Sequence, residues 1–284
     1  MLSIQHVLCG ALAYETEQDF KDHLGALVLP DAIRAYTGNR QLSHFEQSPD
    51  GQDVSWLQYP SDMKSMQGMT VQGYLVPNIP PCVLGERSDL KAFHDHNQHL
   101  DKTMYDGIEM HLRQDIAFDN YLRDEVDCNG KYVDCFMRDN VEMDGKELRE
   151  WIGRMEQQGF YLLAQQLYEK KGITANQAWL EQEVKPVLEE QYPQDLADKT
   201  FSFMKIDPKY DAYITNHDWS HTYEGPCNPN TYREFYDNLL AQLQETPSSH
   251  ESVRNCSDRF LDLSSYEDKF ADMVEATHGF GPSL

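Results

Sequence analysis

The stretch MYDGIEMHLRQDIAFDNYL, residues 104–122, decides the fold predicted for this chain. Its apolar residues recur at helical spacing and predict a helix over residues 103–125. His111, Asp115 and Asp119 follow at intervals of one turn, so they share one face of that helix. The same stripe carries the apolar residues Met104, Ile108, Leu112, Ile116 and Leu122. We therefore expect the polar side chains on the inward face.

Ionised carboxylates on an inward face are costly unless a cation neutralises them. A divalent metal ion is one effective neutraliser, and histidine nitrogens with carboxylate oxygens suit zinc. Further residues of these types occur earlier in the chain. The full candidate set is His6, Asp31, His44, His111 and Asp115. These residues indicate a metal-dependent enzyme.

The net charge limits the partners of this acidic protein. Its 284 residues include 48 acidic and 24 basic ones, which gives a formal charge of -24. Such a surface repels phosphate backbones, so we expect no binding of long nucleic acid. A small phosphate-ester substrate remains compatible with this charge, because a bound metal can reverse the local field.

The N-terminus and the cysteines bear on the compartment. The first residues lack a basic region and turn acidic by Glu15, unlike a secretory signal. The initiator Met1 favours this interpretation over a mature chain trimmed of its leader. No apolar run approaches the length of a membrane span, so we expect no integral membrane protein. The six cysteines show no CxxC pair, and reduced thiols in the cytoplasm are the expectation.

The remaining pattern is mostly helical, and strand-like alternation is scarce. Residues 45–90 and 206–230 are rich in turn-forming residues and are expected to be largely irregular. Periodicity and capping signals predict helices over residues 3–14, 144–171, 174–192, about 230–245 and about 265–277.

The simplest organisation is a single all-α domain over residues 1–284. It would comprise a metal-site half of about 1–125 and a helical C-terminal half of about 140–284. A split into two domains near residue 140 is the alternative.

The order of the candidate ligands resembles that of a known family. His6 is followed by Leu24-Gly25-Ala26 with Pro30-Asp31, by Ser43-His44-Phe45 and by His111-x-x-x-Asp115. This order resembles the zinc-dependent phospholipase C family, a wider all-helical group that includes the S1/P1 nucleases. Its members use a histidine near the N-terminus, an aspartate after a "PD" turn, a histidine in "SHF" and an HxxxD on a helix. The resemblance covers roughly the first 125 residues.

The resemblance implies an all-α fold and a set of metal ligands. These ligands would be His6, Asp31, His44, His111 and Asp115. Asp115 could bridge two ions, because a carboxylate has two oxygens to share.

The chain departs from the family pattern after the HxxxD motif. The family places a further histidine there and then an HxxxE, whereas this chain has Tyr121 and no nearby histidine. The nearest later pair is His217 and His221, which would either complete the site or be ordinary surface residues. One or two zinc ions, rather than a three-metal cluster, are therefore expected.

The expected function is metal-dependent hydrolysis of a phosphoric ester, either a phosphodiester or a nucleotide or lipid headgroup. Zinc would lower the pKa of bound water and polarise a phosphoryl oxygen. Asp31 or Asp119 would accept the proton from that water, or Asp119 would orient a ligating histidine. The alternatives are a non-catalytic ligand-binding or interaction protein on the same helical fold, and a metal with a purely structural role.

A second polar cluster runs from His94 to His99 and is followed by Asp101. Histidine-rich tracts can bind metal. A solvated linker or the beginning of the motif helix is the favoured interpretation here.

Overall fold

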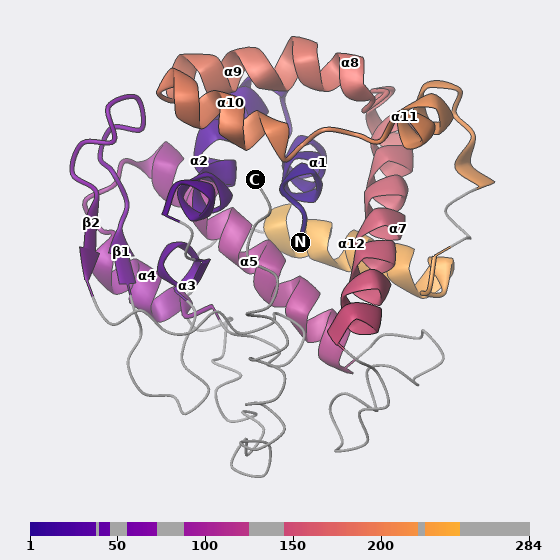
Figure 1. The fold of residues 1–284 in the computed structure, drawn as a ribbon, viewed down its shortest axis with the longest axis horizontal. Coiled ribbons are helices and arrows are strands. Elements are labelled where there is room, and N and C mark those ends of the chain that lie inside the picture. The colour runs from indigo at the N-terminus through magenta and orange to yellow at the C-terminus, as the bar shows by residue number, and fades with distance from the viewer. Residues whose placement is uncertain (38–39, 46–55, 73–87, 125–144, 221–224, 245–284) are drawn as a thin grey trace.

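The computed structural model describes residues 1–37, 40–45, 56–72, 88–124, 145–220 and 225–244. Within these ranges the protein is mostly helical, as predicted, with one two-stranded antiparallel sheet (Figure 1). None of the helices in these ranges is both long and apolar enough to cross a membrane. The first elements are α1 (Ser3–Ala13), α2 (Glu17–Thr37), α3 (Arg40–His44), β1 (Trp56–Gln58), β2 (Thr70–Gln72), α4 (Leu90–His96) and α5 (Lys102–Asp124). The later ones are α7 (Gly145–Lys171), α8 (Gln177–Trp179), η2 (Leu180–Val184), α9 (Lys185–Gln191), α10 (Gln194–Ser202), α11 (Pro208–Thr215) and α12 (Pro229–Gln244).

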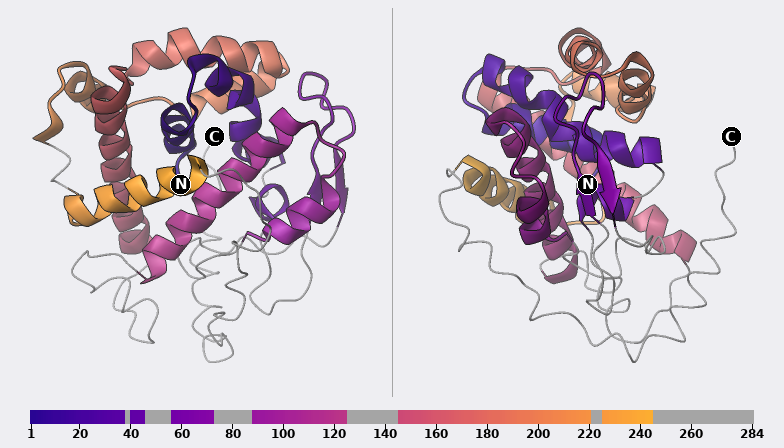
Figure 2. Two further views of the ribbon diagram at one scale, coloured as in Figure 1. Left: turned by 180° about the vertical axis from the view of Figure 1, so that it is seen from behind. Right: turned by 90° about the vertical axis from the view of Figure 1, so that its left-hand side faces the viewer.

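Helix α1 is an inner helix of the bundle. Every residue from Ile4 to Ala13 is buried, which is typical of a helix that is covered on all sides. Helices α2, α7 and α12 pack against it. Its beginning lies near the middle of the molecule, between α5 and α7 (Figures 1 and 2). A polar residue of α1 is therefore placed in the core.

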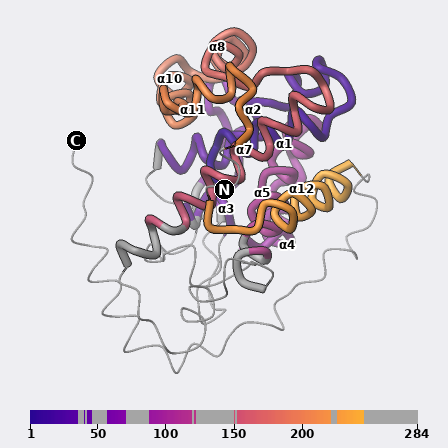
Figure 3. Tube along the Cα trace, turned by 90° about the vertical axis from the view of Figure 1, so that its right-hand side faces the viewer, coloured from indigo at the N-terminus to yellow at the C-terminus, as the bar shows by residue number. Residues whose placement is uncertain are grey.

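Helices α2 and α5 form the most extensive helix pair and define the wall opposite α7. Helix α2 also contacts α3, α9 and α10, while α5 contacts α4 and α12. Figure 3 shows α12 alongside α5, on the side away from α8 and α10. The pair thus holds the predicted motif helix against the apolar segment that precedes Pro30.

Several boundaries confirm the signals in the sequence. Helix α7 ends before Gly172, whose φ of +70° is the left-handed conformation that glycine adopts easily at a helix C-terminus. The next helix begins at Gln177 rather than at the predicted residue 174, because Asn176 caps α8 by accepting a hydrogen bond from the backbone N–H of Trp179. The motif helix α5 matches the predicted range within one residue.

Two expectations about irregular segments are wrong in part. Helix α11 lies within the segment expected to be irregular, because Asp207 accepts a hydrogen bond from the Lys209 N–H and Pro208 occupies the first helical turn. The long segment 45–90 contributes β1 and β2. The helix expected at about 265–277 lies outside the described residues.

Close packing of α2 on α5 depends on Gly107. A Cβ added there would lie 2.6 Å from the Ala26 Cβ and 3.0 Å from the Leu27 backbone nitrogen. Any side chain at this position would push the two helices apart. Gly107 therefore sets the distance between the helices that carry most of the candidate ligands.

Replacing Gly107 with alanine is expected to destabilise the protein by roughly 1–3 kcal/mol, the usual cost of overpacking a core. Urea denaturation measures this free energy of unfolding. The matched control is Gly153→Ala, where a new Cβ would meet open space on an exposed helix position. Alanine at that control position should be neutral or stabilising. Equal effects of the two substitutions would contradict this account of the α2–α5 contact.

Candidate metal centre

The candidate ligands from the first 115 residues lie together in one buried cluster. They come from four helices that are packed on one another. His6 is on α1, Asp31 on α2, His44 at the end of α3, and His111 and Asp115 on α5. Asp31 is 6% exposed and the others 1% or less. In combination they form two overlapping groups that could hold a metal ion, with His111 common to both.

Proline in α2 shapes one wall of this cluster. Pro30 lies inside the helix, where a proline removes a backbone hydrogen bond and opens the preceding turn. The carbonyl of Leu27 in that turn accepts a hydrogen bond from His111 Nδ1 at 2.8 Å. Asp31 directly follows the proline and points its carboxylate toward the same cluster. The Pro-Asp pair thus orients one histidine and supplies one carboxylate.

All three histidines direct Nδ1 to an oxygen acceptor outside the cluster. His6 Nδ1 lies 2.7 Å from Gln114 Oε1, and His111 Nδ1 lies 2.8 Å from the Leu27 carbonyl. His44 Nδ1 lies 3.1 Å from the Arg40 carbonyl. A carbonyl oxygen only accepts, so the contacts of His6 and His111 place the ring proton on Nδ1 and the lone pair on Nε2. His44 Nδ1 also lies 2.8 Å from the Ser43 hydroxyl, which can either donate or accept. Metal-binding histidines are typically held in this way by their other nitrogen.

The Nε2 atoms and carboxylate oxygens are spaced as ligands of one ion. His44 Nε2, His111 Nε2 and Asp115 Oδ2 form a triangle with edges of 3.1, 3.4 and 3.6 Å. Ligand atoms about 3.4 Å apart are what tetrahedral zinc requires with bonds of about 2.0–2.1 Å. Asp31 Oδ1 lies 3.6 Å from His44 Nε2 and is placed to be a further ligand.

The other oxygen of Asp115 faces a different histidine. His6 Nε2 lies 3.3 Å from Asp115 Oδ1, and the His6 ring stacks on His111 with centroids 3.7 Å apart. Both carboxylate oxygens therefore point at imidazole nitrogens. This arrangement is compatible with one ion or with two ions bridged by Asp115.

Two buried atoms of the cluster have no hydrogen-bond partner among the described residues. They are His6 Nε2 and Asp31 Oδ1. A buried polar atom without a partner costs free energy, and here both are potential ligand atoms aimed into the cluster. The Nε2 atoms of His44 and His111 face each other at 3.1 Å in the same cluster. A cation among these atoms would give the two unpartnered atoms a partner, so the residues present fit a metal ion.

Positive groups of the protein itself already contact Asp115. The α-amino group of Met1 donates to Oδ1 at 2.8 Å, and Arg40 Nη2 donates to Oδ2 at 2.8 Å. Burial alone would raise the pKa of Asp115, but these two cations hold it well below its usual value. A metal ion is therefore one of several cations that can neutralise this carboxylate.

Asp31 is balanced in a similar way. Burial would raise its pKa, but the close approach of His44, at 3.6 Å from Oδ1, and the neighbouring rings of His111 and His6 hold the pKa well below its usual value. Ser3 Oγ donates to Oδ2 at 2.7 Å, and Arg34 Nη1 lies 3.9 Å from Oδ1. Arg34 has 52% of its side chain exposed, so this edge of the cluster lies nearest to solvent. Both carboxylates are ionised at neutral pH.

Two of the cluster histidines, by contrast, are held neutral. Burial lowers the pKa of His6 to about 4, assisted by the nearby His111. Burial and the Arg40 guanidinium lower the pKa of His44 to about 3. Neutral imidazoles are the form that binds metal. His6 and His44 thus present unprotonated nitrogens at neutral pH.

Besides the Met1 amine, Ser3 and Arg34, sequence reasoning missed Arg40, Gln114 and Glu156. Arg40 lies one helical turn before His44, the same spacing that identified His111 and Asp115, so this signal was available. Gln114, beside Asp115, orients His6. Glu156 on α7 is half-buried and lies within electrostatic reach of Asp115, Arg34 and Arg40; burial raises its pKa. No motif in the sequence singles out Glu156.

The candidate ligands and proton acceptor from later in the sequence are His217, His221 and Asp119. His217 is exposed, its ring stacks on Tyr168 and its Nε2 bonds the Thr174 hydroxyl at 2.9 Å, so the structure does not bring it to the cluster. Its position after α11 at the surface is the physical reason. His221 lies outside the described residues. Asp119 lies on α5 one turn after Asp115, but its side chain is not among those described.

The second histidine-rich cluster has structural roles. Asn97 Oδ1 accepts from the Tyr59 backbone N–H, and its amide donates to the Leu57 carbonyl, so this residue holds β1. His99 Nε2 contacts the Tyr59 carbonyl, and His94 Nδ1 contacts the Tyr105 hydroxyl. Tyr59 in turn donates its hydroxyl to the Ser43 carbonyl beside His44. The tract therefore supports the cluster from outside.

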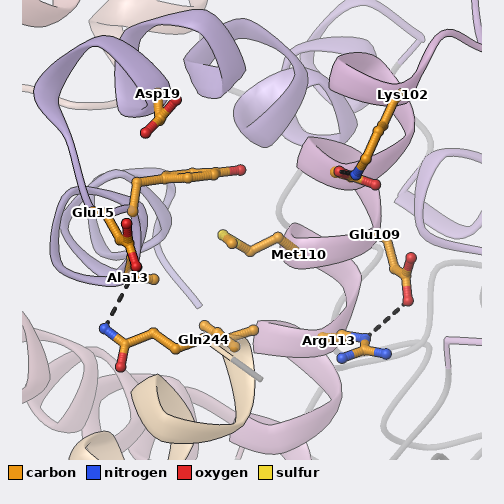
Figure 4. A pocket seen from close by; sticks show the side chains of 11 residues that line it. Ala13, Glu15, Asp19, Lys102, Glu109, Met110, Arg113 and Gln244 are labelled. Atoms are coloured by element: carbon orange, nitrogen blue, oxygen red, sulfur yellow. Dashed lines mark hydrogen bonds and ion pairs between the residues drawn. The ribbon is translucent and has the colours of Figure 1, made fainter. Parts of the chain in front are cut away.

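A separate hollow of about 300 Å³ lies on another side of α5. Figure 4 shows Met110 of α5 extending toward Glu15 across it, with Asp19 of α2 and Gln244 of α12 nearby and with Glu109 and Arg113 at its rim. Glu109 accepts from Arg113 Nε at 3.0 Å, and Lys102 pairs with Asp106. No ligand of the buried cluster lines this hollow.

Comparison with known proteins found no matching family model, curated protein or solved structure. The functional argument therefore rests on the residues of this chain and on their geometry.

The metal-free protein is expected to lose stability as the pH falls from 7 to 5. The folded pKa values of His6 and His44, about 4 and about 3, lie below the usual 6.5, so the unfolded chain binds protons first. Stability present above pH 6.5 is thus lost on acidification, by on the order of 1 kcal/mol per pH unit and group. Thermal unfolding in chelator measures it.

The matched pair for this experiment is His44→Gln against His217→Gln. The first substitution should make the melting temperature less dependent on pH, whereas the second, at an exposed ring, should leave the dependence as it is. A wild-type melting temperature that stays constant from pH 7 to 5 would contradict the buried neutral histidines.

Proposed function

We propose that the protein is a zinc-dependent hydrolase of a phosphoric ester. The observation that carries the proposal is the convergence of three imidazole Nε2 atoms and two carboxylates in one buried cluster. Two of the ligand atoms have no hydrogen-bond partner among the described residues. Nitrogen and oxygen donors at this spacing suit zinc.

The proposed ligands divide between the two oxygens of Asp115. His44, His111 and Oδ2 would hold one ion, joined by Asp31. A second ion would use His6 and Oδ1. Bound zinc would lower the pKa of a water ligand toward neutrality and polarise a phosphoryl oxygen.

The chain's own groups would handle the proton and the substrate charge. Asp31 is ionised and lies at the edge nearest to solvent, so it is the proposed proton acceptor, with Asp119 as the further candidate. Arg34 and Arg40 place two guanidinium groups at the cluster. Positive charge concentrated in a protein of net charge -24 favours a small anionic substrate.

The family relationship is also part of the proposal. Helical architecture and the gathering of His6, Asp31, His44, His111 and Asp115 agree with what the zinc-dependent phospholipase C resemblance implies. A bilayer substrate is disfavoured because anionic leaflets repel so acidic a surface. We therefore propose a small phosphate ester, met in the cytoplasm, as the substrate.

Zinc analysis tests the site directly. Elemental analysis of the zinc-loaded and dialysed full chain is expected to give one or two equivalents, with little or none in His44→Ala and Asp115→Ala. His217→Ala is the matched control and should retain the wild-type content, because its ring lies elsewhere. Far-ultraviolet circular dichroism verifies that each variant is folded. Equal zinc in all four proteins would show that the metal binds outside this cluster.

Hydrolysis of bis-p-nitrophenyl phosphate and p-nitrophenyl phosphate tests the reaction. Chelator should abolish turnover and added zinc should restore it, because the metal supplies the activated water. Undiminished turnover in chelator would refute the mechanism.

A non-catalytic binding protein is the second candidate. It is favoured by the near-complete burial of the ligands and by the Met1 and Arg40 cations that already balance Asp115. If the protein only binds a ligand, or if zinc only stabilises the packing of the helices, zinc would raise the melting temperature. Neither p-nitrophenyl ester would then be hydrolysed.

A further inference from the structure

Each carboxylate of the cluster is paired with its own arginine. Arg40 Nη2 lies 2.8 Å from Asp115 Oδ2, and Arg34 Nη1 lies 3.9 Å from Asp31 Oδ1. Arg40 approaches from α3 with 9% of its side chain exposed, while Arg34 approaches from α2 and is half exposed. The two guanidinium groups therefore flank the cluster at an inner and an outer position.

Metal binding would upset this balance. Asp31, Asp115, Arg34 and Arg40 together have no net charge, so one zinc ion would add two positive charges that these four side chains do not balance. The Met1 amine and Glu156, which also lie within electrostatic reach, are of opposite sign and offset one another. Uncompensated charge in a buried site is costly, so the loaded site requires an anion.

The number of donors restricts which anion fits. Zinc and two guanidinium groups would engage three oxygens of one phosphate if each contacts a different one. A phosphomonoester offers three non-esterified oxygens and carries nearly two negative charges at neutral pH. A phosphodiester offers two such oxygens and one charge. Arginine suits this role because its planar fork matches phosphate oxygens.

We propose that Arg34 and Arg40 form an anion subsite that selects the terminal phosphate of a phosphomonoester over a phosphodiester. The inference rests on the proposed function, because the subsite is completed by zinc in the cluster. Arg40 is paired with Asp115 in the metal-free protein and turns toward the phosphate when zinc takes up the carboxylate. Phosphate and zinc then strengthen each other's binding.

Calorimetric titration with methyl phosphate and dimethyl phosphate at pH 8 tests the subsite. In the zinc-loaded full chain, methyl phosphate should bind at least tenfold more tightly than dimethyl phosphate. Chelator should abolish the binding of methyl phosphate. Equal affinity for the two esters would overturn the proposal.

Substitutions of the two arginines test which side chains bind the phosphate. Arg34→Gln should weaken methyl phosphate about tenfold, the loss of one charge-assisted hydrogen bond, while the zinc content is unchanged. Arg233→Gln is the matched control, since Arg233 is also a partly exposed arginine paired with a carboxylate, at 2.9 Å from Glu169. Arg40→Lys keeps the positive charge but removes the planar guanidinium group. This substitution should also weaken the binding of methyl phosphate without loss of zinc.

The outcomes separate this inference from the function on which it rests. Zinc that binds and supports ester hydrolysis, with methyl phosphate affinity unchanged in Arg34→Gln and Arg40→Lys, would overturn the subsite alone. A wild-type protein that binds no zinc would overturn both.

Discussion

Burial of the Asp115 carboxylate is the constraint on which the structure of the N-terminal half depends. This side chain has no solvent exposure and lies on the central helix α5. Removing an ionised carboxylate from water costs several kcal/mol unless charges and donors surround it. The Met1 amine and Arg40 supply positive charge, and each comes from a different segment of the chain. Each of these segments must reach the same point for the carboxylate to be tolerated.

Apolar packing brings together the helices that surround Asp115, and the buried carboxylate restricts which arrangement of these helices is tolerated. Helix α1 is buried along its whole length, so His6 is placed in the core by its neighbours. Gly107 allows α5 to approach α2 closely, which lets the Leu27 carbonyl reach the His111 ring. The hydrophobic effect thus provides the free energy that packs these helices together. The packed helices in turn bring the polar side chains of the cluster into contact.

Sequence reasoning was most successful where one helix carries the whole pattern. The four-residue spacing of His111 and Asp115, within an apolar stripe, predicts both the helix and its inward polar face. Joining them to His6, Asp31 and His44 required a motif order, because periodicity carries no information on which helices pack together. Which of several suitable histidines meets the cluster is decided by tertiary packing.

His217 and the β1–β2 hairpin show what the sequence pattern could not predict. An HxxxH spacing at residues 217–221 gives the correct residue types for a ligand pair, but the ring of His217 packs on Tyr168 at the surface after α11. The hairpin has strands of three residues each, too short for alternation to be detected. Glu156 reaches the cluster only because α7 packs on α1, a contact between segments about 150 residues apart.

The contrast between the local and the overall charge limits what this cluster can serve. The chain carries a net charge of -24, yet two arginines and an amino group gather at one buried point. At physiological ionic strength the repulsive field is screened within about 8 Å, so a small phosphate compound can approach the cluster. A polyanion must instead lie along many acidic side chains at once, and its repulsion grows with each one. The proposed subsite of Arg34 and Arg40 is therefore compatible with a single phosphate group, whereas we expect the surrounding surface to repel long chains of them.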